Sequence, residues 1–306
     1  MDSTIASGKI VLSGASGMLG AAVHRALATR GVNILQLVRR APASEGQIAW
    51  NPAAEIPLED TTPLEGAAAA VHLSGASLAA HRWTAAYRRE MMTSRVESTH
   101  RLATILAGLR QPPKTLLVAS AVGIYGDRGD EVLDENSAPG NGFLANLCAH
   151  WERAAEPAVK AGVRVVHLRF GVVLGPGQGA LAQMLPPFHL GLGAKLGSGR
   201  QWMSWVALDD VVEAILFALK EPAVSGAVNV TSPHPVTNAE FTRALGRRLR
   251  RPALLTVPAF ALRLMFGEMA DEALISSSRA IPTKLLAAGF RFSYPDVDSA
   301  LERALG

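Results

Sequence analysis

The chain of 306 residues is 49% hydrophobic, which is enough for one large core or for a core with a smaller lobe beside it. Its 30 basic and 26 acidic residues leave a net charge of +4, and no nucleic-acid reader motif accompanies this small surplus, so we expect no nucleic-acid partner. The single cysteine, Cys148, excludes an intrachain disulfide; neither a secretory signal nor an apolar run of about 18 residues is present, so we expect a cytoplasmic protein with no membrane partner.

Strand and helix signals alternate through the first half of the sequence. Apolar runs predict strands at residues 9–13, 32–38, 69–73, 114–119 and 163–170. Helical patterns lie between them at residues 18–30, 85–109 and 142–160. Continuous apolar strands separated by helices are typical of a parallel sheet that is covered on both faces.

The pattern changes after residue 171. Gly and Pro are dense at 175–199, which is typical of loops that carry function. A helix at 209–219 and a last sheet strand at 227–230 follow, and then short helices, of which two are expected to begin at Pro282 and Pro295. We therefore predict an α/β protein with a Rossmann-like doubly wound parallel sheet and a smaller C-terminal α+β substrate lobe. The sheet domain would take residues 1–170 and 206–231, and the lobe residues 171–205 and 232–306.

A glycine-rich turn follows the first predicted strand. In the segment SGASGMLG, Gly14 permits a tight turn, Gly17 lets the backbone approach a pyrophosphate, and Gly20 lets the next helix pack closely on the sheet. Free backbone N–H groups at the start of that helix would bind the anion. An ordinary strand-to-helix turn is the alternative, but the strand–turn–helix context favours a dinucleotide site.

The end of the second predicted strand indicates which dinucleotide binds. NAD-binding sequences carry an acidic residue about 20 positions after the turn, where it binds the adenosine ribose. This sequence has Arg39 and Arg40 at that point, and guanidinium groups match the 2′-phosphate of NADP. We therefore expect NADP(H) as the cofactor, against the alternative that both arginines are ordinary solvated charges.

Several stretches together resemble the extended short-chain dehydrogenase/reductase superfamily, and within it the epimerase-family, or NAD-dependent epimerase/dehydratase-like, proteins. The resemblance covers nearly the whole chain. It rests on SGASGMLG, HLSGASLA from His72, SRVEST from Ser94, SAVGIYGDRG from Ser120, GFLANLCAHWE from Gly142, LRFGVVLG from Leu168, LGSGRQWMSWVALDD from Leu196 and IPTKLLAAGFRFSYPDV from Ile281. It implies a Rossmann-like domain that holds NADP(H) and a C-terminal substrate lobe.

The resemblance also implies which residues hold the cofactor. Residues 16–19 should contact the pyrophosphate, and residues 74–75 should lie along the cofactor. Residues 120–121 and 170–173 should pass beside the nicotinamide. Together with the glycine turn and the two arginines, the expected cofactor-binding residues are Gly14, Ser16, Gly17, Met18, Leu19, Gly20, Arg39, Arg40, Ser74, Gly75, Ser120, Ala121, Phe170, Gly171 and Val172.

The sequence departs from the superfamily at the catalytic positions. Active members use a Ser or Thr, a Tyr and a Lys to orient the substrate and move a proton. By position these fall on Ala121, Leu144 and Cys148, so the usual set is absent. Tyr125, Cys148 and Lys195 are left as weak catalytic candidates. Their alternatives are a cofactor-pocket wall, a small buried residue and a solvated loop charge.

Basic and aromatic side chains are the candidate substrate ligands. Arg95 and Arg169 could bind an anionic substrate, or could pair with an acidic neighbour instead. Tryptophan is also a common core residue. The full candidate set is Arg95, Arg169, Lys195, Gln201, Trp202 and Trp205. The histidines are scattered, so no metal site is expected.

Two functions remain open from the sequence. The first is an NADP(H)-dependent oxidoreductase or epimerase of unknown substrate, and the second is a non-catalytic NADP(H)-binding regulatory or sensor protein that acts through a protein partner. An enzyme should keep a cavity above the nicotinamide, with polar groups converging from Arg95, Lys195 or Gln201. A sensor could fill that space with apolar side chains. The sequence predicts neither the substrate nor the oligomeric state.

Overall fold

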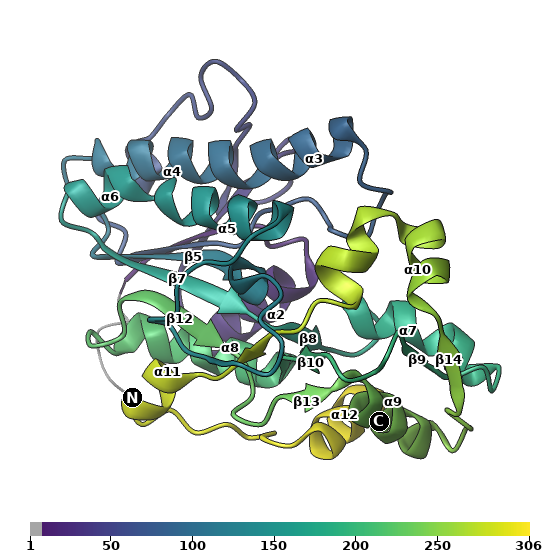
Figure 1. The fold of residues 1–306 in the computed structure, drawn as a ribbon. Helices are drawn as coiled ribbons and strands as arrows, with labels where there is room; N and C mark the ends of the chain where they lie inside the picture. The colour runs from purple at the N-terminus through teal and green to yellow at the C-terminus, as the bar shows by residue number, and fades with distance from the viewer. Residues whose placement is uncertain (1–7) are drawn as a thin grey trace.

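A parallel sheet of seven strands forms the centre of the protein, whose computed structural model describes residues 8–306 (Figure 1). The spatial order is β12-β7-β5-β4-β1-β2-β3, so the chain winds outward from β1 in one direction and then in the other. The strands are β1 (Ile10–Ser13), β2 (Ile34–Val38), β3 (Gln47–Ala49), β4 (Ala69–His72), β5 (Thr115–Ala121), β7 (Arg164–Phe170) and β12 (Gly226–Val230). This arrangement confirms the predicted Rossmann-like, doubly wound fold.

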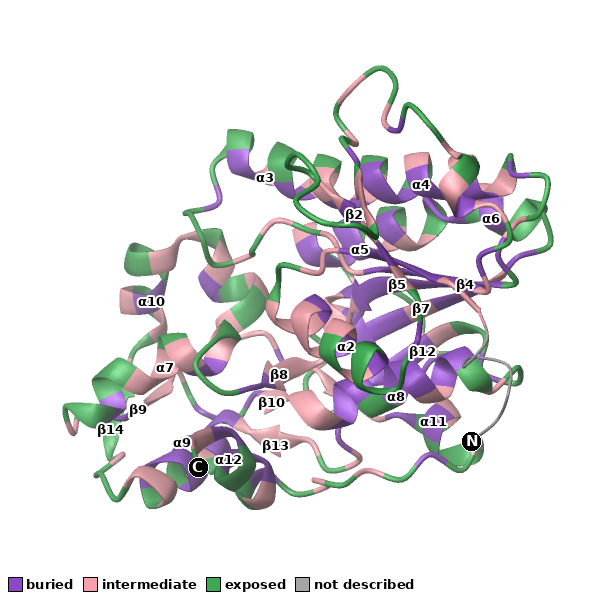
Figure 2. Ribbon diagram, turned by 180° about the vertical axis from the view of Figure 1, so that it is seen from behind, coloured by how far each residue is buried: buried purple, intermediate pink, exposed green. Residues whose placement is uncertain are grey.

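Helices cover both faces of the sheet. One layer holds α3 (Ala85–Met92), α4 (Ser98–Ala107), α5 (Phe143–Arg153) and α6 (Glu156–Lys160), and the other holds α2 (Met18–Thr29), α8 (Leu208–Lys220) and α11 (Thr283–Ala287) (Figure 1). The central strands are buried between these layers (Figure 2), which explains why they are continuously apolar in sequence. Within residues 8–306, no helix has the length and apolar character needed to cross a bilayer.

The C-terminal part of the chain builds a second, smaller core around Trp205, Phe241 and Leu301. Its helices are α7 (Gly179–His189), α9 (Asn238–Leu249), α10 (Ala259–Phe266) and α12 (Val297–Leu305). Short strand pairs join it to the loops of the main sheet: β8 (Val172–Leu174) with β11 (Trp205–Ala207), β9 (Ala194–Leu196) with β14 (Leu255–Val257), β10 (Trp202–Met203) with β13 (Val236–Thr237), and β6 (Val132–Leu133) with β15 (Arg279–Ala280). The first seven residues of the domain predicted at 1–170 lie outside the described part.

One of the two long predicted helices is interrupted. The stretch predicted at 85–109 is helical from Ala85 to Ala107, with a π-helical segment, η2 (Thr93–Glu97), between α3 and α4, whereas residues 154–155 separate α5 from α6. Pro157 lacks an N–H and therefore fits the first turn of a new helix better than the interior of a long one. Pro295 does not begin α12, because the Asp296 carboxylate caps that helix by accepting a hydrogen bond from Ser299 N at 2.9 Å. Pro282 likewise precedes the first residue of α11.

The glycine turn fixes how closely α2 approaches the sheet. Gly14 has a φ of 78°, and a Cβ there would lie 2.7 Å from the carbonyl carbon of Leu73 at the end of β4. A Cβ on Gly20 would overlap the carbonyl oxygen of Gly14, because the first turn of α2 lies directly on the turn backbone. Glycine is therefore required at both positions for packing alone.

We expect Gly20→Ala to lower the free energy of unfolding by about 3 kcal/mol or more, because backbone rather than a movable side chain occupies the space of the new methyl group. Gly17→Ala is the matched control: its Cβ would have no neighbour closer than 3.6 Å, so its stability should stay near that of the wild type. Urea unfolding of the two variants checks this. Equal midpoints would contradict the packing role of Gly20.

Candidate functional site

The candidate site lies at the carboxyl edge of the sheet, where the glycine turn meets the segment after β4. A Cβ on Gly14 would also lie 2.8 Å from Ser74 N, so the two backbone segments are in contact. Ser74 donates a hydrogen bond to Ser13 Oγ at 3.2 Å. In open α/β sheets, ligands bind outside the carboxyl ends of the strands at the point where strand order reverses. That point here is between β1 and β4.

The start of α2 provides an anion-binding surface. Gly17 is the N-cap residue and no side chain of the described chain caps this helix, so its first-turn N–H groups remain available. Ser16 and Gly17 are exposed, and a Cβ on Gly17 would meet only Gly14 O at 3.6 Å. These features fit a dinucleotide pyrophosphate, whose charge would be stabilised by the N–H groups and the helix dipole.

Arg39 and Arg40 lie immediately after β2 and are both exposed. Leu37 pairs with Ser13 of β1, so the two arginines follow the strand next to the glycine turn. Neither takes part in an ion pair with another residue of the described range 8–306. The position fits the phosphate of an adenosine ribose, whose other end would reach the turn.

The remaining predicted cofactor residues lie along the same edge. Ala121 and Phe170 are register partners at the ends of β5 and β7, so their backbones are side by side. Gly171 packs against the backbone of Ser204, and Val172 begins β8. The Met18 side chain lies against Gly175 and Gly179 and so links α2 to the second lobe, while Leu19 packs on the main core. The assignment of these residues to the cofactor stays a prediction.

A buried ion pair lies beneath this edge. Arg169 binds Glu152 through two hydrogen bonds of 2.8 Å, and Ser120 donates to the same carboxylate at 2.7 Å. Burial alone would raise the pKa of Glu152, but the hydrogen bonds and charge of Arg169 hold it below the usual value. Arg169 therefore forms the ion pair that was the alternative to substrate binding. The Ser120 hydroxyl is likewise directed at Glu152 rather than at the cleft.

Tyr125 belongs to the same buried network. Its hydroxyl accepts a hydrogen bond from Arg169 Nη1 at 2.9 Å and lies 2.7 Å from Asn229 Oδ1 and 2.9 Å from the Asp134 carbonyl oxygen. The side chain is completely buried, and this burial raises its pKa. The structure therefore rules against the weak candidacy of Tyr125 as a replacement for the missing phenol, because its buried hydroxyl is bonded inside the fold.

The usual catalytic positions are apolar. Leu144 and the sulfur of Cys148 face Gly123, at 3.4 Å and 4.0 Å from the Cβ that would be built there. Burial raises the pKa of Cys148 to about 12, so a thiolate is not populated at neutral pH. Leu144 packs in an apolar cluster with Trp83, Tyr87, Met91 and Leu147. Cys148 is therefore a packing residue, which corrects its candidacy as a nucleophile.

The expected substrate ligands of the second lobe do not converge on the cleft. Gln201 is buried and donates to the carbonyl oxygens of Leu196 and Leu274 at 3.0 Å and 3.1 Å. Trp205 is fully buried and donates to the His234 carbonyl oxygen at 3.1 Å. Both side chains hold the lobe together, because their polar groups are satisfied inside it. Their assignment to a substrate is corrected accordingly.

Trp202 and Lys195 lie nearer the surface of the lobe. Trp202 donates to Asp130 Oδ1 at 2.8 Å, and the Arg279 guanidinium stacks 4.0 Å from its ring centre. The Lys195 side chain lies along Gly199, where an added Cβ would come within 2.9 Å of its Cδ. Arg95 lies beside the segment after β4, where its guanidinium carbon would be 3.2 Å from a Cβ on Gly75.

Glu272 is a residue of the site that sequence analysis did not identify. It belongs to the π-turn η4 (Ala270–Leu274) of the second lobe, and its carboxylate accepts hydrogen bonds from Phe143 N at 3.1 Å and Leu144 N at 3.0 Å. It therefore caps α5 at the position where the superfamily carries its Tyr. The one sequence signal for this contact is the glycine at position 142. Gly142 has a φ of 106°, and a Cβ there would overlap the Glu272 carboxylate.

A cavity of about 320 Å³ opens beside this cap. It is lined by Gly126, Asp127, Asn141, Arg263, Asp271, Glu272, Ile275 and Ser276. Arg263 is paired with Asp271 at 2.9 Å, so the lining carries an excess of carboxylates. Among residues 8–306, no group of three or more His, Cys, Asp or Glu side chains is arranged to hold a metal ion.

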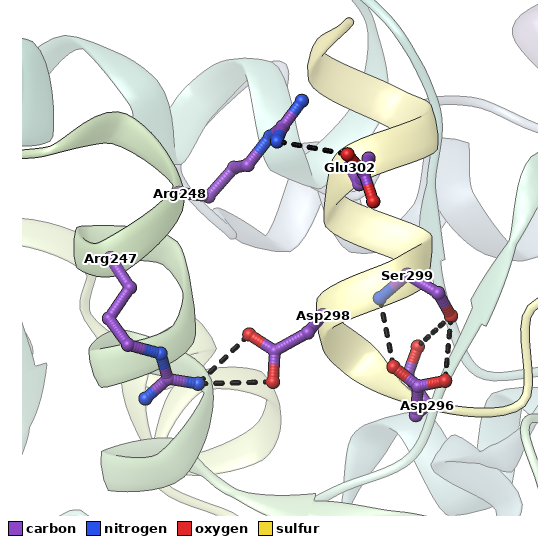
Figure 3. A pocket seen from close by; sticks show the side chains of 6 residues that line it. All are labelled: Arg247, Arg248, Asp296, Asp298, Ser299 and Glu302. Atoms are coloured by element: carbon purple, nitrogen blue, oxygen red, sulfur yellow. Dashed lines mark hydrogen bonds and ion pairs between the residues drawn. The ribbon is translucent and has the colours of Figure 1, made fainter.

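A second hollow lies between α9 and α12, far along the chain from the glycine turn. Figure 3 shows that its charges satisfy one another: Arg247 binds Asp298 at 2.9 Å and Arg248 binds Glu302 at 3.3 Å. Asp296 is occupied in capping α12 through Ser299. These exposed pairs brace two helices and leave no free charge for a ligand.

His72 lies at the end of β4, directly below the glycine turn. Its Nδ1 is 2.5 Å from Ser13 Oγ and its Nε2 is 3.2 Å from Ser98 Oγ. The ring is completely buried, and this burial lowers its pKa to about 4. The neutral imidazole therefore links β1, β4 and α4 through hydrogen bonds.

Comparison with known proteins agrees with this architecture. The NAD dependent epimerase/dehydratase family matches residues 10–231, and a domain of unknown function, DUF1731, matches residues 257–304. Epimerase family protein Mb2239 of Mycobacterium bovis is 46% identical over 97% of both chains.

Two solved structures are similar along nearly the whole chain. The human epimerase family protein SDR39U1 with NADPH is 33% identical, with a TM-score of 0.87 over 97% of this chain and 98% of that one. A nucleoside-diphosphate sugar epimerase from Corynebacterium glutamicum is 34% identical, with a TM-score of 0.81 over 98% of this chain and 58% of that one. These similarities confirm the resemblance to epimerase-family, extended short-chain dehydrogenase/reductase proteins.

We expect the stability of the protein to fall by about 3 kcal/mol as the pH falls from 7 to about 4 because of His72 alone. The unfolded histidine takes up a proton near pH 6.5, whereas the folded one resists it until about pH 4, so stability is full above the unfolded pKa and lost below it. His72→Asn should be less stable at pH 7 but should lose less on acidification. Urea unfolding of both proteins between pH 7 and about pH 4 measures this difference. Parallel pH profiles of the free energy of unfolding would count against this role of His72.

Proposed function

The chain belongs to the NAD dependent epimerase/dehydratase family, and from that premise we propose that it is an NADP(H)-dependent oxidoreductase or epimerase of a small, polar molecule. The observation that carries the proposal is the uncapped start of α2 at Gly17, beside the turn that only glycine can form at Gly14 and Gly20. This surface binds a pyrophosphate through backbone N–H groups.

Two observations support NADP(H) over NAD(H). Arg39 and Arg40 are exposed after β2, where a NAD-binding chain has an acid. The human SDR39U1 structure, which covers the same length of chain, is described with NADPH. A guanidinium group binds a 2′-phosphate through charge-assisted hydrogen bonds and offers nothing equivalent to a bare ribose hydroxyl.

The residues of this chain have a limited part in the proposed reaction. The bound cofactor supplies the hydride chemistry. Residues 16–19 hold its pyrophosphate, the two arginines hold its phosphate, and Ser74 with Gly75 forms the wall beside it. Leu144 has no proton to give, and burial raises the pKa of the Cys148 thiol to about 12, so a proton would come from water, from the substrate or from another residue.

The cavity beside Glu272 indicates the class of substrate. Its lining contains Asp127, Asp271 and Glu272, while its one guanidinium, that of Arg263, is neutralised by Asp271. An anionic substrate would be repelled there, whereas hydroxyl and amide groups could bind the carboxylates and Asn141. We therefore assign an uncharged, hydroxyl-rich or carbonyl-bearing molecule to this cavity.

A second function is favoured by the apolar catalytic positions. Leu144 fills the Tyr position inside an apolar cluster, and Tyr125, Gln201 and Trp205 are bonded within the fold. A chain that binds NADP(H) without moving a proton fits a regulatory protein whose folded state or partner contacts respond to the cofactor. The enzyme and the sensor share the nucleotide site and differ only in turnover.

We expect NADPH to bind with submicromolar to micromolar affinity and NADH at least tenfold more weakly, which corresponds to about 1.4 kcal/mol for the phosphate contacts. Arg39→Asp should remove this preference, and Arg153→Asp, an exposed arginine at the end of α5, should not. Fluorescence titration of the wild type, Arg39→Asp and Arg153→Asp with NADPH and with NADH measures this preference. If neither nucleotide binds the wild type, the proposed function fails.

Turnover separates the two functions. We expect 4-deuterated NADPH, incubated with the protein and a metabolite extract, to transfer deuterium to an uncharged hydroxyl or carbonyl compound. Mass spectrometry of the extract detects the product, and Gly17→Asp, which places a carboxylate against the pyrophosphate site, is the control. Repeated absence of labelled product with tight NADPH binding would favour the sensor.

A further inference from the structure

Arg95 is a buried cation without a counter-ion. Its side chain is 7% exposed, and its guanidinium donates to two neutral carbonyl oxygens, those of Ala76 at 2.7 Å and Met91 at 3.4 Å. The indole ring of Trp151 lies 5.2 Å away on one side. None of the ion pairs among residues 8–306 includes Arg95.

The lack of an ion pair at Arg95 contrasts with Arg169, the other buried arginine of the site. Arg169 is buried to a similar extent, at 6% exposure, but it has a bidentate carboxylate partner in Glu152. A guanidinium stays protonated in a protein, and a buried charge without a partner is costly. Arg95 is retained at this cost within a π-turn, and such turns occur frequently at functional sites.

The guanidinium lies directly against the segment that follows β4. A Cβ on Gly75 would lie 3.2 Å from Arg95 Cζ, and Gly75 belongs to the segment after β4 that contacts the glycine turn. Burial raises the pKa of the Cys148 thiol, and the nearby charge of Arg95 lowers that pKa by a smaller amount. This charge is therefore next to the position where the superfamily carries its catalytic lysine.

The strand order separates Arg95 from the two exposed arginines. Arg39 and Arg40 follow β2 on one side of β1, whereas Gly75 follows β4 on the other side. A dinucleotide held across this edge would have its adenosine half toward Arg39 and Arg40 after β2, and its nicotinamide half toward β4 and β5. Arg95 is thus the uncompensated charge on the nicotinamide side.

We propose that Arg95 makes the protein select the reduced cofactor, NADPH, over NADP⁺. The nicotinamide ring is neutral in NADPH and carries a positive charge in NADP⁺, so a nearby buried cation disfavours only the oxidised form. The phosphates carry the same charge in both forms, and their attraction to Arg95 cancels in the comparison. This inference rests on the proposed function, because it requires a nicotinamide dinucleotide in the cleft.

The consequence holds for both functions. An enzyme with this bias is occupied mainly by NADPH and releases NADP⁺ more readily, whereas the overall equilibrium of the reaction is unchanged. A sensor with this bias responds to the ratio of NADPH to NADP⁺ rather than to the sum of the two, because only one form occupies it at comparable concentrations.

The test is the ratio of the two dissociation constants, Kd(NADP⁺)/Kd(NADPH), measured by calorimetry on the wild type, Arg95→Gln and Arg95→Lys. We expect a ratio of about ten or more in the wild type, a ratio at least about fivefold smaller in Arg95→Gln, and a preserved ratio in Arg95→Lys. Arg153→Gln controls for removal of an exposed charge. The ratio is insensitive to a uniform loss of affinity, so partial destabilisation does not imitate the effect.

Two results would overturn the inference and leave the proposed function standing. One is tight binding of both forms to the wild type with equal affinity, which needs no variant to fold. The other is a ratio in Arg95→Gln equal to that of the wild type. Failure of the wild type to bind either form would defeat the proposed function as well, so the two failures are distinguishable.

Discussion

The close contact between the start of α2 and the sheet is the constraint on which the site depends. Gly20 lies on the backbone of Gly14, and Gly14 lies on the segment that leaves β4. This contact leaves the first-turn N–H groups of α2 uncapped at the carboxyl edge of the sheet. The ends of β1, β2 and β4 are adjacent because β1 pairs with both β2 and β4, so the exposed arginines and Gly75 follow the strands on either side of the glycine turn. The close approach of the backbone at Gly14 and Gly20 is one that a side chain would prevent.

Two buried arginines of the site differ in whether a carboxylate neutralises their positive charge. Arg169 is neutralised by Glu152 and orders a network through Tyr125 and Ser120, so it stiffens the floor of the site. Arg95 meets only carbonyl oxygens and an indole ring, so its charge acts on whatever binds beside Gly75. Apolar residues stand at the usual proton-transfer positions, while the glycine turn and the uncapped start of α2 have the features of a dinucleotide site.

The second lobe is attached at the point where the superfamily places its reacting phenol. Glu272, within the DUF1731 region, caps α5 through Phe143 N and Leu144 N. A carboxylate at a helix N-terminus is stabilised by the dipole, so this contact joins the lobe to the nucleotide domain directly beside the cleft. The cavity that adjoins it is shared by both parts of the chain, which allows binding there to affect their mutual packing.

The sequence by itself determined the parallel sheet, the glycine turn, and Arg39 with Arg40, because each depends on a few neighbouring residues and on a period of two or 3.6. It also showed that the Tyr and Lys positions hold Leu144 and Cys148. Tertiary structure alone decided which charged and polar groups were free. Arg169 pairs with Glu152, and Gln201 donates to two carbonyl groups. Arg95 donates to carbonyl oxygens and forms no ion pair with a carboxylate of residues 8–306. Hydrogen-bond and ion-pair partners come from distant segments, as Glu272 comes to α5 from 129 residues away. Sequence spacing does not specify such pairing, because it depends on how the elements pack in space.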